Sequence, residues 1–128
     1  MSNPNLKKVF NNHLVEFIED VIEIFPENVD IKTGLTMIEG LKFAKPSFLI
    51  TIWKTSILDL YEEQIMSGDE GFFLNKNYSN DLAEENKNEV LKIIDDIKKL
   101  MIETTKENRN KTMKYVQNLT KICKMYFQ

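Results

Sequence analysis

The sequence contains few of the residues from which catalytic and metal centres are usually built. Among 128 residues there is one histidine, His13, one cysteine, Cys123, and one arginine, Arg109. A structural zinc site needs about four nitrogen or sulfur ligands, so one histidine and one cysteine exclude it. A single cysteine also excludes an internal disulfide and fits a reducing compartment. We therefore expect no metal and no cofactor.

Long apolar runs are also missing. A membrane-spanning helix needs roughly 18–20 apolar residues, and charged side chains interrupt the most apolar stretch, residues 46–68. They are Lys54, Asp59, Glu62 and Glu63. The opening segment MSNPNLKKVF lacks the apolar centre of a signal peptide. We therefore expect no membrane partner.

The stretch 46–68 itself predicts a central helix, with Pro46 near its first turn and Gly68 as its stop. Its first half is apolar around most of its circumference, so several neighbours must enclose it. These side chains are Phe48, Leu49, Ile50, Ile52 and Trp53. Its second half is apolar on one side only, through Ile57, Leu58, Leu60, Tyr61 and Ile65.

Further helices follow from apolar side chains that recur every three or four residues. The first is expected from about Pro4 to Phe25 with Asn3 as its N-cap, and the second from Asp30 to about Ala44. Gly34 and Gly40 in the second helix suggest close approach of another helix. A later helix is expected to begin at Ser79 or Asp81, and the last helix to cover about Thr112 to Phe127.

Residues 103–112 contain no large apolar side chain. A break near Asn108-Arg109-Asn110 is favoured, because a rod without an apolar face has little packing to hold it. The absence of glycine and proline there favours the alternative, one long helix. With no strand pair in evidence, residues 1–128 predict an all-α, single-domain bundle of four to five helices around helix 46–68.

Residues 69–80, DEGFFLNKNYSN, form the one long irregular segment. Loops of this length are often functional or are folded onto the core by their own apolar side chains. Folding onto the core is favoured, because a solvent-facing Phe-Phe-Leu would be an adhesive patch. The alternative is a partner-binding loop that uses Phe72, Phe73, Leu74 and Tyr78.

The net charge of −3 hides an asymmetry. Residues 1–105 carry a net −8 and residues 106–128 a net +5. The basic segment either packs beside acidic helices of its own chain or faces an external acidic partner. Nucleic acid is one such partner, with contacts expected from Lys106, Arg109, Lys114, Lys121 and Lys124. A single arginine leaves little capacity for bidentate base reading, which weakens this hypothesis.

Catalytic motifs are not apparent. His13 has Glu16 three residues later, a pair that could shuttle protons but that more often forms an ordinary surface contact. Glycine-rich phosphate-binding motifs are absent from the sequence. We therefore expect a protein that is not an enzyme.

Two stretches carry a resemblance, FNNHLVEFIEDVIEIFPENVDIKTG from Phe10 and IMSGDEGFFLNKNYSNDL from Ile65. Together they resemble short α-helical proteins encoded by large nucleocytoplasmic DNA viruses (giant viruses), a group without an assigned activity. The resemblance covers roughly the first two thirds of the chain and implies no active-site residues. It implies a minor virion component or an accessory factor, located in the host cytoplasm or the virion. A viral or host protein would then be the partner, and a homo-oligomer is an option.

Overall fold

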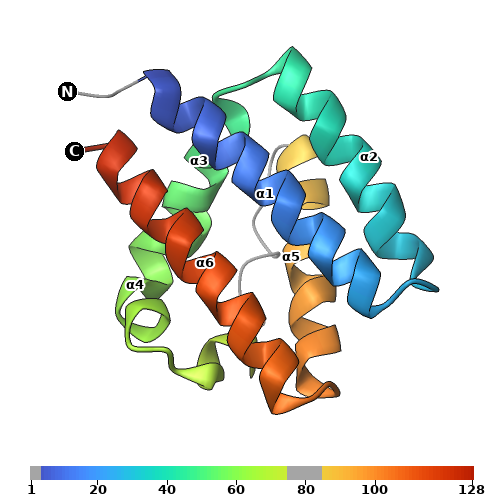
Figure 1. Ribbon diagram of the computed structural model, residues 1–128. Coiled ribbons are helices and arrows are strands. Elements are labelled where there is room, and N and C mark those ends of the chain that lie inside the picture. The colour runs from blue at the N-terminus through green and yellow to red at the C-terminus, as the bar shows by residue number, and fades with distance from the viewer. Residues whose placement is uncertain (1–3, 75–84) are drawn as a thin grey trace.

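The computed structural model describes residues 4–74 and 85–128, in which helices are joined by short turns and no strand is present (Figure 1). The helical elements are α1 (Pro4–Ile24), α2 (Val29–Ala44), α3 (Phe48–Trp53), η1 (Lys54–Leu58), α4 (Asp59–Met66), η2 (Glu70–Leu74), α5 (Glu85–Ile102) and α6 (Lys106–Tyr126). Because α3, η1 and α4 follow one another without interruption, they form one rod, here called the central helix. The described residues therefore confirm an all-α bundle.

Helix α1 lies between α2 and α6 and runs antiparallel to both, so the two ends of the chain come to the same end of the bundle (Figure 1). The central helix contacts α1, α2 and α6, while α5 packs against α2 and the short η2 turn. None of the described helices combines the length and the apolarity that crossing a bilayer requires.

The core closes tightly around Trp53, whose side chain is 2% exposed. Apolar side chains of α1, α2, α3 and α5 meet there and leave a void of about 10 Å³. A void of this size holds at most one water molecule. The expected enclosure of the first half of the central helix is therefore observed.

The two ends of the central helix are capped in different ways. It begins at Phe48 with Ser47 as N-cap, so Pro46 lies directly before the cap, near the first turn as predicted. Gly68 ends it as predicted, with φ of +74°, a conformation that is strained for residues with a Cβ atom. The N–H of Gly68 donates to Ile65 O at 3.0 Å, and that of Asp69 donates to Gln64 O at 2.9 Å. These two bonds form a Schellman motif, which satisfies the last carbonyls of the helix.

The middle of the central helix widens into the π turn η1, which the sequence pattern did not predict. The backbone N–H of Asp59 bonds to Lys54 O, five residues back. Leu60 follows Trp53 by seven residues. In an uninterrupted α-helix this spacing would place both side chains on the same side, facing the core. The extra residue in the π turn rotates Leu60 outward, where it is 59% exposed. The prediction of Leu60 on the inner side is therefore wrong.

The N-cap of helix α2 lies two residues earlier than expected. Asn28 is its N-cap, since its side chain accepts a hydrogen bond from Ile31 N at 3.0 Å, and Asp30 lies in the first turn instead. Gly34 does permit close approach, because a Cβ there would lie 2.6 Å from Cγ1 of Ile93. The same expectation is wrong for Gly40, where a Cβ would meet open space.

The break between the last two helices exists, but it lies at 103–105 and not at Asn108-Arg109-Asn110. Thr105 is the N-cap of α6, and its Oγ1 accepts a bond from Asn108 N at 3.2 Å. Helix α6 therefore begins at Lys106 and not near Thr112. The predicted caps Asn3, Ser79 and Asp81 lie outside the described residues.

The two glycines of α2 give a matched test of the packing. Gly34→Ala is expected to lower the free energy of unfolding by about 1–3 kcal/mol, because Ile93 must move to admit the methyl group. Gly40→Ala is expected to raise it by about 0.5–1 kcal/mol, since alanine favours a helix and meets nothing there. Urea unfolding measures both. Equal effects of the two substitutions would contradict the close contact between α2 and α5.

Candidate functional site

The aromatic pair of the predicted contact loop lies in the core. Phe72 and Phe73 belong to η2 and are 1% and 3% exposed. The ring of Phe72 packs edge-on against Tyr61, with centroids 5.6 Å apart. Neither phenylalanine is available to a partner in this conformation, which corrects the partner-binding hypothesis at these two positions. The side chain of Leu74 and the whole of Tyr78 lie outside the described residues.

Lys98 is buried beneath these aromatic rings, with 2% of the residue exposed. Its Nζ lies 4.3 Å from the ring centroid of Phe72 and 5.3 Å from that of Tyr61. Burial lowers the pKa of Lys98 to about 8, and the nearby carboxylate of Asp95 opposes this shift. Attraction to the ring faces partly replaces the water that the ammonium group has lost.

Lys98 lies near the C-terminal end of α5, where a positive charge suits the helix dipole. A signal for its burial was present, because Lys98 follows Ile94 by four residues and precedes Met101 by three, within the apolar stripe. An amine with a pKa near 8 is more nucleophilic at neutral pH than an ordinary lysine. At 2% exposure it nevertheless offers a substrate no approach, so its environment fits packing.

The basic residues of α6 divide into two groups. Arg109 donates to Glu70 Oε1 at 2.9 Å and to Thr104 O at 2.7 Å, and Lys124 pairs with Glu62. Arg109 and Lys124, which were predicted to contact nucleic acid, are thus paired with acidic residues of the same chain. Lys106, Lys114 and Lys121 are exposed and form no ion pair with the part of the chain that the structure describes. The basic segment therefore packs partly beside acidic elements of its own chain.

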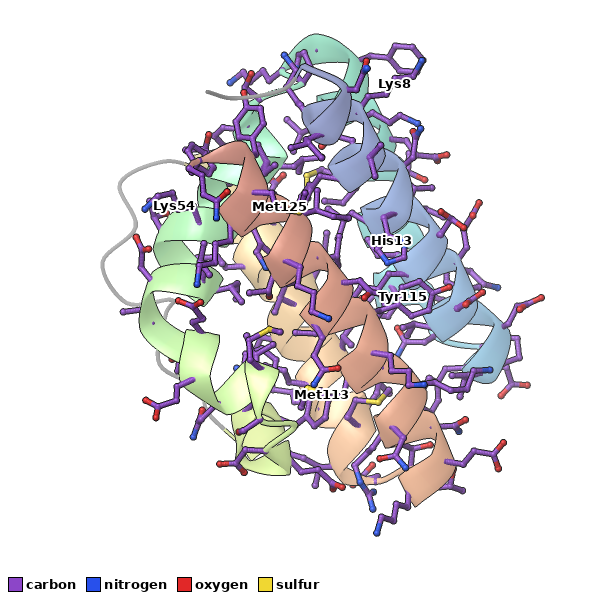
Figure 2. All side chains as sticks on the ribbon, turned by 60° about the vertical axis from the view of Figure 1, so that its left-hand side comes forward. Lys8, His13, Lys54, Met113, Tyr115 and Met125 are labelled. Carbon is purple, nitrogen blue, oxygen red and sulfur yellow. The ribbon has the colours of Figure 1, made fainter. Side chains whose placement is uncertain are left out.

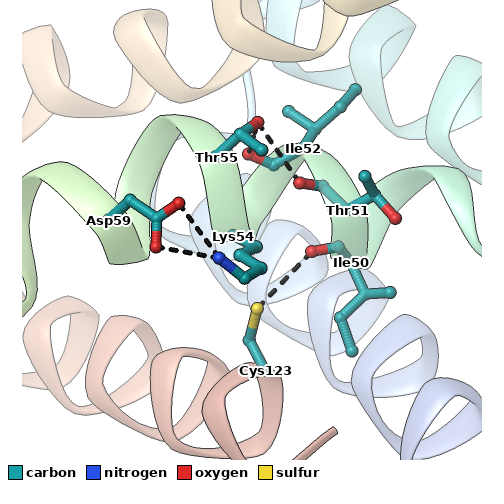
Figure 3. Close-up of polar contacts among 7 residues, drawn as sticks. All are labelled: Ile50, Thr51, Ile52, Lys54, Thr55, Asp59 and Cys123. Atoms are coloured by element: carbon teal, nitrogen blue, oxygen red, sulfur yellow. Dashed lines mark hydrogen bonds and ion pairs between the residues drawn. The ribbon is translucent and has the colours of Figure 1, made fainter. Parts of the chain in front are cut away.

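Polar side chains surround the π turn (Figure 3). Cys123 Sγ lies 3.4 Å from Ile50 O, to which it donates, and Thr55 Oγ1 donates to Thr51 O at 3.3 Å. Lys54 Nζ lies 3.1 Å from both carboxylate oxygens of Asp59. Burial raises the pKa of the Cys123 thiol to about 12, so the thiol stays protonated and unreactive near neutral pH.

His13 lies at the contact between α1 and α6, beside Tyr115 (Figure 2). The two ring centroids are 5.0 Å apart, and His13 Nδ1 lies 3.8 Å from Glu16. Tyr115 donates a hydrogen bond to Asp20, and this bond raises the pKa of Tyr115 to about 12. The Nε2 atom of His13 is buried and has no hydrogen-bond partner among the described residues. Since Nε2 is shielded, this geometry does not favour the proton-shuttle reading.

One outward-facing groove is lined by apolar and acidic side chains of α4. Leu60 is 59% and Met66 38% exposed, and Glu63 lies between them in the sequence. The lining residues are Leu58, Asp59, Leu60, Glu62, Glu63 and Met66. This surface is called the α4 face below. Asp59 and Glu62 are already paired with Lys54 and Lys124, so much of its charge is neutralised.

Metal-binding clusters of three or more histidine, cysteine or carboxylate side chains are not found among the residues that the structure describes. Comparison with protein families, with characterised proteins and with solved structures finds no match.

Lys98 should give the stability a defined pH dependence. Its pKa is about 8 in the folded protein and 10.5 in the unfolded chain, so the unfolded chain binds more protons between these values. The free energy of unfolding of the wild type should therefore rise with pH across this window, relative to Lys98→Met, by on the order of 2 kcal/mol. Urea unfolding below, within and above the window measures this. If the difference in free energy of unfolding between the wild type and Lys98→Met did not vary with pH, the buried environment assigned to Lys98 would be contradicted.

Proposed function

We propose that the protein acts by binding another protein through the α4 face and that it is not an enzyme. The observation that carries this proposal is the outward rotation of Leu60 by the π turn. A regular helix would have buried this side chain, whereas irregular backbone here places it in solvent. Irregular turns of this kind occur frequently at functional sites.

The composition of the α4 face supports the same proposal. Protein interfaces usually combine an apolar centre with a polar rim. Leu60 and Met66 supply apolar surface, and methionine adapts readily to different partners. Asp59 and Glu62 of this face are paired with Lys54 and Lys124, so among its acidic side chains docking would leave Glu63 without an ion pair to a described residue.

The sequence resemblance supports a viral setting for this activity. We propose a giant-virus protein that is a minor virion component or an accessory factor, in the host cytoplasm or the virion. Its partner would be a viral or host protein, or a second copy of the same chain. Quantification of the protein in purified particles tests the virion role, since an accessory factor would be absent from them.

The α4 face can be tested with two matched substitutions. Leu60→Glu places a charge at the proposed contact, and Val29→Glu places one at a 70% exposed valine on α2. Cross-linked partners of the tagged protein are then quantified by mass spectrometry, and self-association is measured by sedimentation. Loss of a central contact residue often costs about 2 kcal/mol, or more than tenfold in affinity.

We expect Leu60→Glu to abolish partner binding or self-association, and Val29→Glu to leave it unchanged. Equal recovery with both variants, at unchanged thermal stability, would contradict the use of the α4 face.

The alternative is a nucleic-acid accessory protein that uses α6. Lys106, Lys114 and Lys121 favour it, because they are exposed and form no ion pair with described residues. This alternative predicts binding to DNA or RNA that weakens with added salt and that Lys114→Glu with Lys121→Glu reduces further. Failure of the wild type to bind a nucleic-acid column at low salt would remove it.

A further inference from the structure

The last turn of α2, next to the connection to α3, carries the most exposed of the large apolar side chains that the structure describes. Phe43 is 88% exposed, and Lys42 and Lys45 flank it in the sequence. Phe48 begins the next helix and is partly buried against the core, with Lys45 Nζ 5.3 Å from its ring centroid. Leaving an aromatic ring in water is unfavourable, so an apolar environment would stabilise Phe43.

Two further lysines reach this connection from α1. Lys7 Nζ lies 3.4 Å from Ser47 Oγ, and Asn11 Nδ2 donates to Pro46 O at 2.9 Å, which fixes the connection against α1. Lys8 is exposed on the next position, and Figure 2 shows it at this end of the bundle. The four lysines Lys7, Lys8, Lys42 and Lys45, with Phe43 and Phe48, are called the basic end below.

The charge of the basic end is not balanced locally. None of its four lysines forms an ion pair with a residue in the described ranges 4–74 and 85–128. Glu39, one turn before Phe43, is the nearest acidic residue along α2. The lysines therefore make this end a surface for an anionic ligand.

We propose that the basic end binds the surface of a lipid bilayer that contains anionic headgroups. Phenylalanine rings insert at the boundary between headgroups and acyl chains, while neighbouring lysines contact the negative headgroups. Phe43 and the lysines beside it meet both requirements on one turn at the end of the molecule. The expectation of no membrane partner followed from the absence of a membrane span, and a peripheral contact needs no span.

The same surface is less suited to nucleic acid. Single-stranded nucleic acid is usually held in a groove with several aromatic rings on which successive bases stack. Here one fully projecting ring stands at a turn, and Phe48 is partly covered by the core. Arginine, the best reader of bases and phosphates, does not occur at this end.

The test is flotation with vesicles of phosphatidylcholine alone and of phosphatidylcholine with phosphatidylserine. We expect binding only to the anionic vesicles, and weaker binding as salt is added. Lys42→Ala with Lys45→Ala should reduce the partition coefficient about 25-fold, taking about fivefold for each lysine. Phe43→Ser should reduce it about tenfold through the lost apolar contact.

Matched controls come from exposed residues elsewhere on the molecule. Lys32→Ala with Lys111→Ala removes two exposed lysines that belong to no proposed surface, and Val29→Ser removes an exposed apolar side chain at the start of α2. Both controls should bind the vesicles as the wild type does, and thermal unfolding confirms that every variant is folded.

Three results would overturn the proposal. The first is failure of the wild type to bind phosphatidylserine vesicles, and the second is an equal loss of binding in the controls. The third is binding to a labelled single-stranded oligonucleotide that depends on Phe43 and Lys42 while vesicle binding does not. Because the α4 face is untouched by Phe43→Ser, loss of lipid binding and loss of protein binding are distinguishable.

Discussion

A buried hydrogen bond between two side chains, Trp53 and Thr120, fixes the position of the central helix against α6. Trp53 Nε1 donates to Thr120 Oγ1 at 3.1 Å, and this hydroxyl donates in turn to Val116 O at 2.7 Å. Both side chains are at most 2% exposed, so an unpaired indole N–H here would be costly. Further along the same two helices, Cys123 and Gln117 donate to backbone carbonyls of the central helix, Ile50 O and Ile65 O. These contacts hold the rod in one position against α6.

This fixed position determines what the outer surface presents. Trp53 and Ile65 both face the core. The π turn between them contains one residue more than an α-helical turn, and Leu60 consequently points to solvent. The same packing leaves the last turn of α2 at the end of the bundle, with Phe43 projecting. The two proposed contact surfaces therefore differ in chemistry. The α4 face combines the apolar side chains Leu60 and Met66 with acidic ones, two of which are paired, and the basic end is aromatic and positive.

Regular periodicity was sufficient to predict the helices and the enclosure of Trp53, because burial repeats every three to four residues. It failed where backbone geometry or tertiary contacts decided the outcome. The π turn at Lys54–Leu58 has no residue signature, so the inward prediction failed at Leu60, although it holds for Tyr61 and Ile65 beyond the turn. At Phe72 and Phe73 the favoured prediction, folding onto the core, agrees with their burial, whereas the alternative of a contact surface does not. The burial of Lys98 was not predicted, although Lys98 follows the apolar periodicity, because the aromatic rings beside it come from elements distant in the sequence.

Because Trp53 is the sole tryptophan, its fluorescence reports directly on the contact that holds the bundle together. The side chain is 2% exposed and bonded to Thr120, so the folded protein should emit at shorter wavelength than the urea-unfolded chain and resist quenching by acrylamide. Thr120→Val should lower the free energy of unfolding by about 1–3 kcal/mol, since it leaves the indole N–H without its acceptor. Emission at the wavelength of the unfolded chain, with unrestricted quenching under native conditions, would contradict a sealed core and the contact surfaces derived from it.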